Sequence, residues 1–252
     1  MKLVLAIAFF ATALIYSSVG FGGGSTYTAL LVVAGVPFAL IPVISLTCNV
    51  AVVSGNSVRF ARAGLVRWRA LAPLVVLSIP AAYVGGRLPV GEVVFVGLLA
   101  LTLLVSGLRL LWTSASTEAE PQPVALGVLL ALGAGIGLLS GVVGIGGGIF
   151  LAPALHALRW GRAREIAAAC SVFILVNSVS GIAGQLQKLD AGRVAEAAAY
   201  WPLLLSVLAG GFLGNRLGVR VFSPATLKRV TAVLILLVAV RLAWRWASLA
   251  SS

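Results

Sequence analysis

Long apolar runs alternate with short polar or charged stretches along most of the chain. An apolar run of about 20 residues can cross the hydrocarbon core of a bilayer as one helix. The runs cover residues 3–19, 25–34, 37–58, 70–83, 93–111, 124–142, 149–158, 166–186, 197–213 and 225–240. This pattern predicts an all-α membrane protein, a polytopic helical bundle of about ten segments that forms one integral membrane domain.

Two of these segments, 25–34 and 149–158, are too short to cross. Ten residues of helix reach about 15 Å, roughly half of the hydrocarbon core. Each short segment follows a glycine cluster, and the two clusters are Gly20-Phe21-Gly22-Gly23-Gly24 and Gly144-Ile145-Gly146-Gly147-Gly148. Each glycine inside a helix costs about 1 kcal/mol relative to alanine, so the clusters predict breaks in the helices. Close packing between neighbouring helices is the alternative use of such glycines.

The glycine clusters also indicate an internal repeat, because the second lies 124 residues after the first. Ser54-Gly55 matches Ser180-Gly181, and a Gly-x-Arg-Leu ending recurs at residues 85–88 and 214–217. We therefore expect two repeats of five segments each, at residues 1–113 and 124–252, joined by a linker at 114–123. Residues 3–19 are expected to be retained rather than cleaved as a signal peptide, because 124–142 occupies the same place in the second repeat.

Five segments per repeat is an odd number, so the second repeat is expected to be inverted relative to the first. Loop charge gives the orientation. With residues 59–69 placed in the cytoplasm, twelve of the 18 lysines and arginines fall on that side and six on the other. The positive-inside rule favours this arrangement, with both termini outside. Inverted repeats with broken helices are a recurring plan of secondary transporters.

Composition limits which partners, cofactors and ionisable groups the protein is expected to use. The chain is 61% hydrophobic and 10% charged, with a net charge of +12. The arginines lie in short loops, where they set topology, so no nucleic-acid partner is expected. Cys48 and Cys170 have no ligand-like spacing, and no cofactor or metal site is expected. The six acidic residues all lie at segment ends or in loops, which disfavours a carboxylate proton relay. A coupling ion (H⁺ or Na⁺) and the oligomeric state stay open.

The polar residues expected at membrane depth are neutral, and many lie near the glycine breaks. A helix N-terminus has free N–H donors and about half a positive charge, which suits an anion. We therefore expect a small anionic substrate near the midplane, held by backbone donors around the breaks and by a few side chains. The candidate residues are Ser18, Gly22, Gly23, Gly24, Ser25, Thr26, Asn49, Gly146, Gly147, Gly148, Asn177 and Ser178. For any single serine or threonine, a bond to its own helix backbone is the competing interpretation.

Other residues leave alternatives open. Arg87 and Arg216 occupy equivalent segment ends, where they either anchor those ends or attract anions. His156 is the single histidine, and with a serine it would be needed for an intramembrane hydrolase. No Gly-x-Ser-x-Gly element is present, so an enzyme is not expected. A channel, or a transporter of another small anion or neutral solute, is the remaining alternative.

Two motifs of the second repeat resemble those of the sulfite exporter TauE/SafE family. They are Ser140-Gly141-Val142-Val143-Gly144-Ile145-Gly146-Gly147-Gly148 and Asn177-Ser178-Val179-Ser180-Gly181. The resemblance extends over nearly the whole chain. It implies a multi-pass permease of the plasma (inner) membrane for sulfite, sulfonates or related organosulfur anions. The first repeat departs from the second motif, because residues 51–55 contain no asparagine to match Asn177.

Overall fold

A computed structural model describes residues 2–112, 120–217 and 224–250. Residues 114–119 of the expected linker, and Arg220 from the loop-charge count, lie outside the described residues. Among the described residues there are eleven helices: α1 (Lys2–Ser18), α2 (Gly24–Val33), α3 (Ile41–Arg62), α4 (Trp68–Arg87), α5 (Glu92–Trp112), α6 (Leu126–Val143), α7 (Gly148–Ala157), α8 (Ala163–Leu186), α9 (Ala191–Ala198), α10 (Trp201–Leu217) and α11 (Pro224–Ala250). The all-helical bundle expected from the apolar pattern is confirmed.

Within the described part of the chain, four helices are long and apolar enough to cross a membrane: α3, α4, α6 and α8. A fifth span is available if α9 and α10, which are bent by 45° at their junction, count as one. Helices α2 and α7 have ten residues each, as expected for the two short segments. The polytopic membrane bundle is therefore confirmed.

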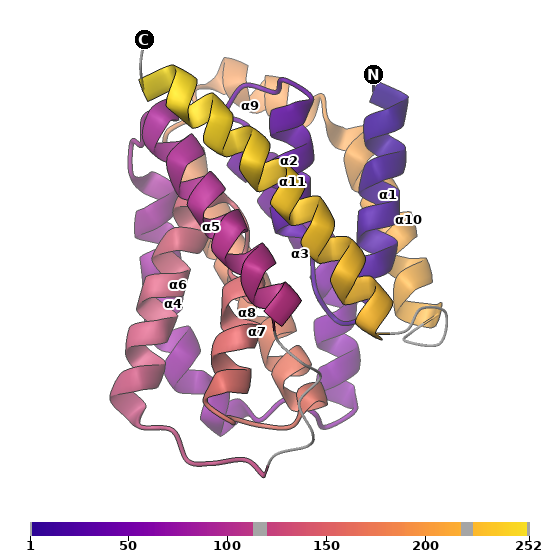
Figure 1. Cartoon of the computed structure of the whole chain (residues 1–252), viewed down its shortest axis with the longest axis vertical. Coiled ribbons are helices and arrows are strands. Elements are labelled where there is room, and N and C mark those ends of the chain that lie inside the picture. Colours follow the sequence, from indigo (N-terminus) through magenta and orange to yellow (C-terminus); the bar gives the residue numbers. More distant parts are fainter. Residues whose placement is uncertain (1, 113–119, 218–223, 251–252) are drawn as a thin grey trace.

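The helices connect at two opposite ends of the bundle. At the α9 end, Lys188 Nζ donates to the carbonyl of Leu88 at 3.0 Å, which joins the turn before α9 to the turn after α4. Figure 1 shows the first turn of α1 and the last turn of α11 at this same end. At the other end, which we call the α7–α8 end, Arg67 Nη1 donates to the carbonyl of Trp160 at 3.0 Å. That contact joins the α3–α4 turn to the α7–α8 turn.

Helices α1 and α2 form one helical hairpin, and α6 and α7 form a second. The N–H of Gln122 donates to the carbonyl of Arg159 at 2.8 Å, so α6 begins where α7 ends, at the α7–α8 end. In Figure 1 the first hairpin opens toward the α9 end instead. The opposed hairpins are compatible with an inverted repeat, which stays a prediction that labelling from the two sides of a membrane would test.

Helices at equivalent places in the two expected repeats pack against each other. Helix α4 runs along α6 and α1 along α10, while α3 contacts α8 and α5 contacts α11. Small residues make the first two contacts close. A β-carbon added at Gly137 would lie 2.5 Å from the carbonyl oxygen of Ser78, and one at Gly214 would strike the carbonyl of Leu14. Neither contact leaves room for a side chain, so these glycines allow the helices to approach.

Some boundaries differ from those expected. Gly85 and Gly86 lie inside α4, not between two segments, because they pack against backbone of α6 and α8. Helix α8 begins at Ala163, inside the stretch expected to be loop. An additional short helix, α9, follows Asp190, whose carboxylate caps it by accepting from the N–H of Arg193 at 2.8 Å. Periodicity alone does not locate such contacts between helices.

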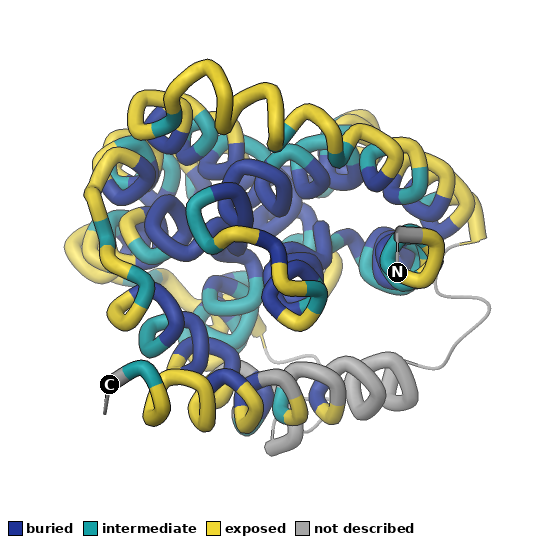
Figure 2. The backbone as a smooth tube through the Cα atoms, turned by 90° about the horizontal axis from the view of Figure 1, so that it is seen from above, coloured by how far each residue is buried: buried dark blue, intermediate teal, exposed yellow. Residues whose placement is uncertain are grey.

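Buried residues gather at the centre of the bundle, and exposed positions face outward (Figure 2). Many outward positions are large and apolar, including Val76, Leu205 and Leu237. Outward apolar side chains are what lipid contact requires. The interior holds fully buried polar side chains as well, among them Asn49, Asn177 and Ser178, each with no exposed surface. These polar residues belong to the region around the two breaks.

Candidate functional site

The two glycine clusters interrupt the helices. Helix α1 ends at Ser18 and α2 begins at Gly24, while α6 ends at Val143 and α7 begins at Gly148. Gly20 and Gly23 have φ angles of 90° and 87°, and Gly144 and Gly147 have 77° and 83°. These left-handed values are strained for other residues but accessible to glycine. The breaks expected from the sequence are therefore confirmed.

Each break presents a helix N-terminus to the interior of the bundle. No side chain caps either N-terminus, where Gly23 and Gly147 occupy the capping positions. The first N–H groups of any helix have no acceptor within that helix. Both short helices therefore expose backbone donors, and the positive ends of their dipoles, at the breaks.

Asn49 of α3 brings the two breaks together. Its Nδ2 donates to the carbonyl of Ile145 in the second break at 3.0 Å. In the first break, a β-carbon at Gly22 would lie 2.5 Å from Asn49 Oδ1, and one at Gly24 would collide with the amide. A β-carbon at Gly146 would lie 2.8 Å from Asn49 Nδ2. One buried amide therefore touches both glycine clusters, which lie next to each other.

Helix α8 approaches the second break as α3 approaches the first. A β-carbon at Gly146 would lie 2.9 Å from Ile174 Cγ2 and 3.1 Å from Ser178 Oγ. At the first break the corresponding neighbours are Asn49 and Val53, each 125 residues earlier in the chain. On α3 the first of the two positions is polar (Asn49) and the second apolar (Val53). On α8 the first is apolar (Ile174) and the second polar (Ser178).

Several buried polar atoms near the breaks have no hydrogen-bond partner among the described residues. They are Asn49 Oδ1, Ser178 Oγ, Asn177 Oδ1, Ser140 Oγ and Tyr27 OH. Leaving such a group unpaired costs about 1–3 kcal/mol, so each invites an explanation. Asn177 is partly engaged, since its Nδ2 donates to Ser78 Oγ at 3.0 Å and to the carbonyl of Phe173 at 2.8 Å.

The candidate residues Ser18 and Thr26, both near the first break, differ in their hydrogen-bond partners. Ser18 donates to the carbonyl of Ile15 at 2.6 Å, a bond to its own helix. Thr26 Oγ1 lies 3.0 Å from Tyr16 OH, and Ser25 is buried. The structure therefore gives Ser18 a local partner and gives Thr26 a partner across the first break.

The two candidate arginines also differ. Arg87 is exposed in the last turn of α4. Arg216 is exposed as well, but its guanidinium carbon lies 4.2 Å from the centre of the Phe212 ring. It also lines a pocket between α3 and α10.

One group beside the first break was not among the candidate residues. Thr28 donates to Ser45 Oγ at 2.9 Å, and Ser45 donates to the carbonyl of Gly24 at 3.1 Å. Ser45 lies four residues before Asn49, on the same face of α3. That helical spacing was the available signal, and it becomes meaningful only once α3 is known to face the break.

His156 lies in the last turn of α7. Eight residues of helix, about 12 Å, separate it from Gly148 at the break. His156 therefore lies at the opposite end of α7 from the break.

Comparison with known proteins agrees with this architecture. The model of the sulfite exporter TauE/SafE family matches residues 4–242. The chain belongs to this family. It is also 35% identical over 245 residues to the probable membrane transporter protein y4hK of Sinorhizobium fredii, covering 95% of this chain and 97% of that protein. No solved structure matches the chain. As a TauE/SafE-type protein, it is a multi-pass membrane protein and a transporter.

Proposed function

We propose that this protein is a secondary permease of the plasma membrane for small sulfur-containing oxyanions such as sulfite, sulfonates or related organosulfur anions. The substrate class follows from the name of the family that the chain belongs to. The proposed site lies near the midplane, where the two glycine breaks meet. The observation that supports it is the contact of Asn49 with both breaks.

The donors available there suit an anion. Two uncapped helix N-termini contribute backbone N–H groups, from Gly22 to Ser25 and from Gly146 to Ile149. The Ser178 hydroxyl adds a donor without a described partner. The Asn49 Nδ2 group has two hydrogens, and Ile145 accepts one of them. Neutral donors of this kind bind an oxyanion without a fixed counter-charge, which allows the ion to be released.

Transport across the membrane requires the site to open alternately to the two sides. In the proposed inverted repeat, the two opposed hairpins carry equivalent breaks, and rocking of one half against the other would expose the site in turn. The α7–α8 end is proposed to face the cytoplasm, because most loop arginines lie there. Both termini would then lie outside.

Flux measurements test the substrate class. Purified protein in proteoliposomes should transport radiolabelled sulfite, thiosulfate or sulfoacetate, and an amino acid serves as the neutral comparison. Transport of the amino acid and of none of the sulfur oxyanions would refute the proposal and favour a neutral-solute transporter. Passive flux that equals the rate of an ion channel would favour the channel alternative.

Cysteine labelling tests the orientation. Both native cysteines, Cys48 and Cys170, are buried and free, so they give little background. A cysteine replacing Arg67 should be labelled only after permeabilisation, and one replacing Asp190 should be labelled from outside. Labelling of both from the same side would rule out the inverted arrangement.

A further inference from the structure

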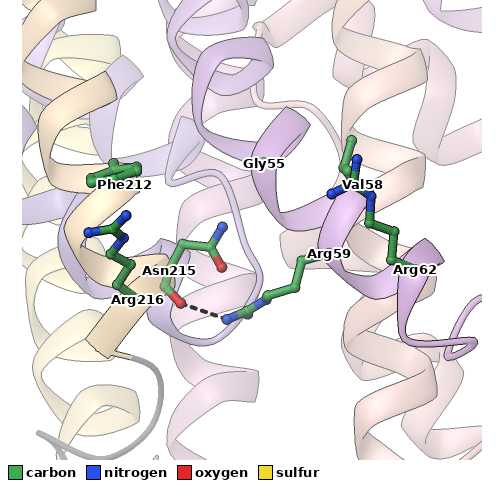
Figure 3. A pocket seen from close by; sticks show the side chains of 7 residues that line it. All are labelled: Gly55, Val58, Arg59, Arg62, Phe212, Asn215 and Arg216. Carbon is green, nitrogen blue, oxygen red and sulfur yellow. Dashed lines mark hydrogen bonds between the residues drawn. The ribbon is translucent and has the colours of Figure 1, made fainter.

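An open pocket of about 370 Å³ lies between the last turns of α3 and α10, at the α7–α8 end (Figure 3). Three arginines line it, Arg59 and Arg62 from α3 and Arg216 from α10. Phe212 and Asn215 of α10 form the facing wall. The pocket is thus outside the break region and combines three cations with an aromatic ring and an amide.

No described carboxylate neutralises these three guanidinium groups. The ion pairs among the described residues are Arg67–Glu165, Arg193–Asp190 and Arg245–Glu92, all outside the pocket. The C-terminal ends of α3 and α10 offset about half a charge each, which leaves a net positive pocket. A concave surface with one sign of charge attracts and concentrates counter-ions.

The arginines differ in how far they are engaged by the protein. Arg59 Nη1 donates to the carbonyl of Asn215 at 2.7 Å, which satisfies a free carbonyl at the end of α10. The Arg216 guanidinium carbon lies over the Phe212 ring, 4.2 Å from its centre, which is a cation–π contact. Arg62 is exposed in the last turn of α3. Planar guanidinium forks held in this way match the oxygen geometry of an oxyanion.

Polar groups connect this pocket with the first break. Asn56 lies three residues before Arg59 on α3 and seven residues after Asn49, so it shares a helix face with Asn49 and is a neighbour of Arg59 along the helix. Asn56 is fully buried, and its Nδ2 has no described partner. Its Oδ1 lies 3.4 Å from Ser17 Oγ, in the last turn of α1 before the break. Along α3, a donor without a described partner therefore lies between Arg59 of the pocket and Asn49 of the break region.

We propose that the arginine pocket, defined by Arg59, Arg62 and Arg216, is an oxyanion-binding vestibule that passes the transported anion to the breaks by way of Asn56. This inference rests on the proposed function for the identity of the anion. The phosphate of an anionic phospholipid such as phosphatidylglycerol, which has no choline cation beside it, has the same binding chemistry. The experiment separates these two sources.

The test uses the double variant Arg62→Gln/Arg216→Gln, because Arg59 also caps α10 and its replacement would disturb the fold. Arg69→Gln is the matched control: Arg69 is exposed in the first turn of α4 at the same end but does not line the pocket. In proteoliposomes of phosphatidylcholine, the apparent Michaelis constant for sulfite transport should be about tenfold higher in the double variant than in the wild type. The control should leave it unchanged. Arg216→Lys should raise this constant by a smaller factor, since lysine keeps the positive charge but lacks the planar pair of guanidinium donors.

The outcomes that overturn the vestibule are specific. A double variant that behaves like Arg69→Gln would show that the arginines only anchor helix ends. A rise that occurs only in membranes containing phosphatidylglycerol would identify a lipid phosphate as the occupant. If the wild-type protein transports no sulfur oxyanion, the proposed function fails. Equilibrium binding of radiolabelled sulfate to purified wild type and double variant still tests the pocket, and equal binding would refute it.

Discussion

At the first break Gly23 packs beside Thr12, whereas at the second break Gly147 packs beside Ile136. A β-carbon at either glycine would lie 2.9 Å from that neighbour. Thr12 and Ile136 are 124 residues apart, the spacing of the two glycine clusters. The two breaks thus share left-handed glycines at two equivalent positions and the same neighbouring positions, although Gly146 is left-handed and its equivalent Gly22 is not. The side chains at the neighbouring positions differ in polarity.

The same exchange occurs on the long helices that follow. Asn49 contacts the first break where Ile174 contacts the second, and Val53 stands where Ser178 does. Glycine supplies the left-handed residues of each break, so Gly20 and Gly23 recur as Gly144 and Gly147. The polarity of the surroundings of each break is set by other helices and varies independently. We expect a bound anion to contact the two breaks unequally, with more side-chain contacts from Asn49 than from any single residue of α8.

The largest effect is expected for Gly147→Val. A β-branched residue is strained at a φ of 83°, and its side chain would meet Ile136 and Phe173. Anion binding to purified protein should be abolished. Gly135→Val is the control, because nothing lies within 4 Å of a β-carbon there. Wild-type anion affinity in monodisperse Gly147→Val protein would show that the second break serves packing alone.

A smaller, asymmetric effect is expected for alanine at the first residue of each short helix. At Gly24 the new methyl would collide with the carbonyl of Ile145, which is backbone and cannot turn away. At Gly148 it would meet Cδ1 and Cγ1 of Ile174, a side chain that shifts more easily than backbone does. Gly24→Ala should lower the free energy of unfolding by about 3 kcal/mol, and Gly148→Ala by less than about 1 kcal/mol. Thermal unfolding in detergent would compare them, and equal losses would contradict the asymmetry.

Two of the buried asparagines, Asn49 and Asn177, should separate anion binding from stability. Asn49→Ala should weaken anion affinity by about 1–3 kcal/mol, because the residue contacts both breaks. Asn177→Ala removes bonds to Ser78 and Phe173 and should mainly lower stability. Isothermal titration and thermal unfolding of both variants would measure the two effects. A larger loss of affinity in Asn177→Ala would place the anion nearer α8.

The smallest effect is expected for Ser178→Ala. The Ser178 hydroxyl is buried without a described partner, so its removal should leave the unfolding temperature unchanged or slightly raised. Anion affinity should fall by about 1 kcal/mol if the hydroxyl donates to the ligand. Unchanged affinity would leave Asn49 as the main side-chain donor to the anion. The two breaks would then differ further, because α8 would contribute no hydroxyl to the anion at the second break.

Much of the fold could be read from local features of the sequence. Apolar length predicts the spanning helices, since α3, α4, α6 and α8 lie within the expected runs to within a few residues. The glycine clusters predict the breaks because the φ preference of glycine is a property of single residues. The inner ends of the short helices, at Gly24 and Gly148, were predictable for the same reason.

The tertiary structure decided which polar residues meet. Asn49 reaches Ile145 across 96 residues of chain, and no local period relates the two. Ser18 satisfies its hydroxyl within its own helix, while Ser178 does not, although both are serines beside a break. Helical periodicity gives the face on which a residue lies, but the neighbour of that face depends on how the two halves pack. The sequence by itself determined that the helices break, and only the packing of α3 and α8 determined what the breaks contact.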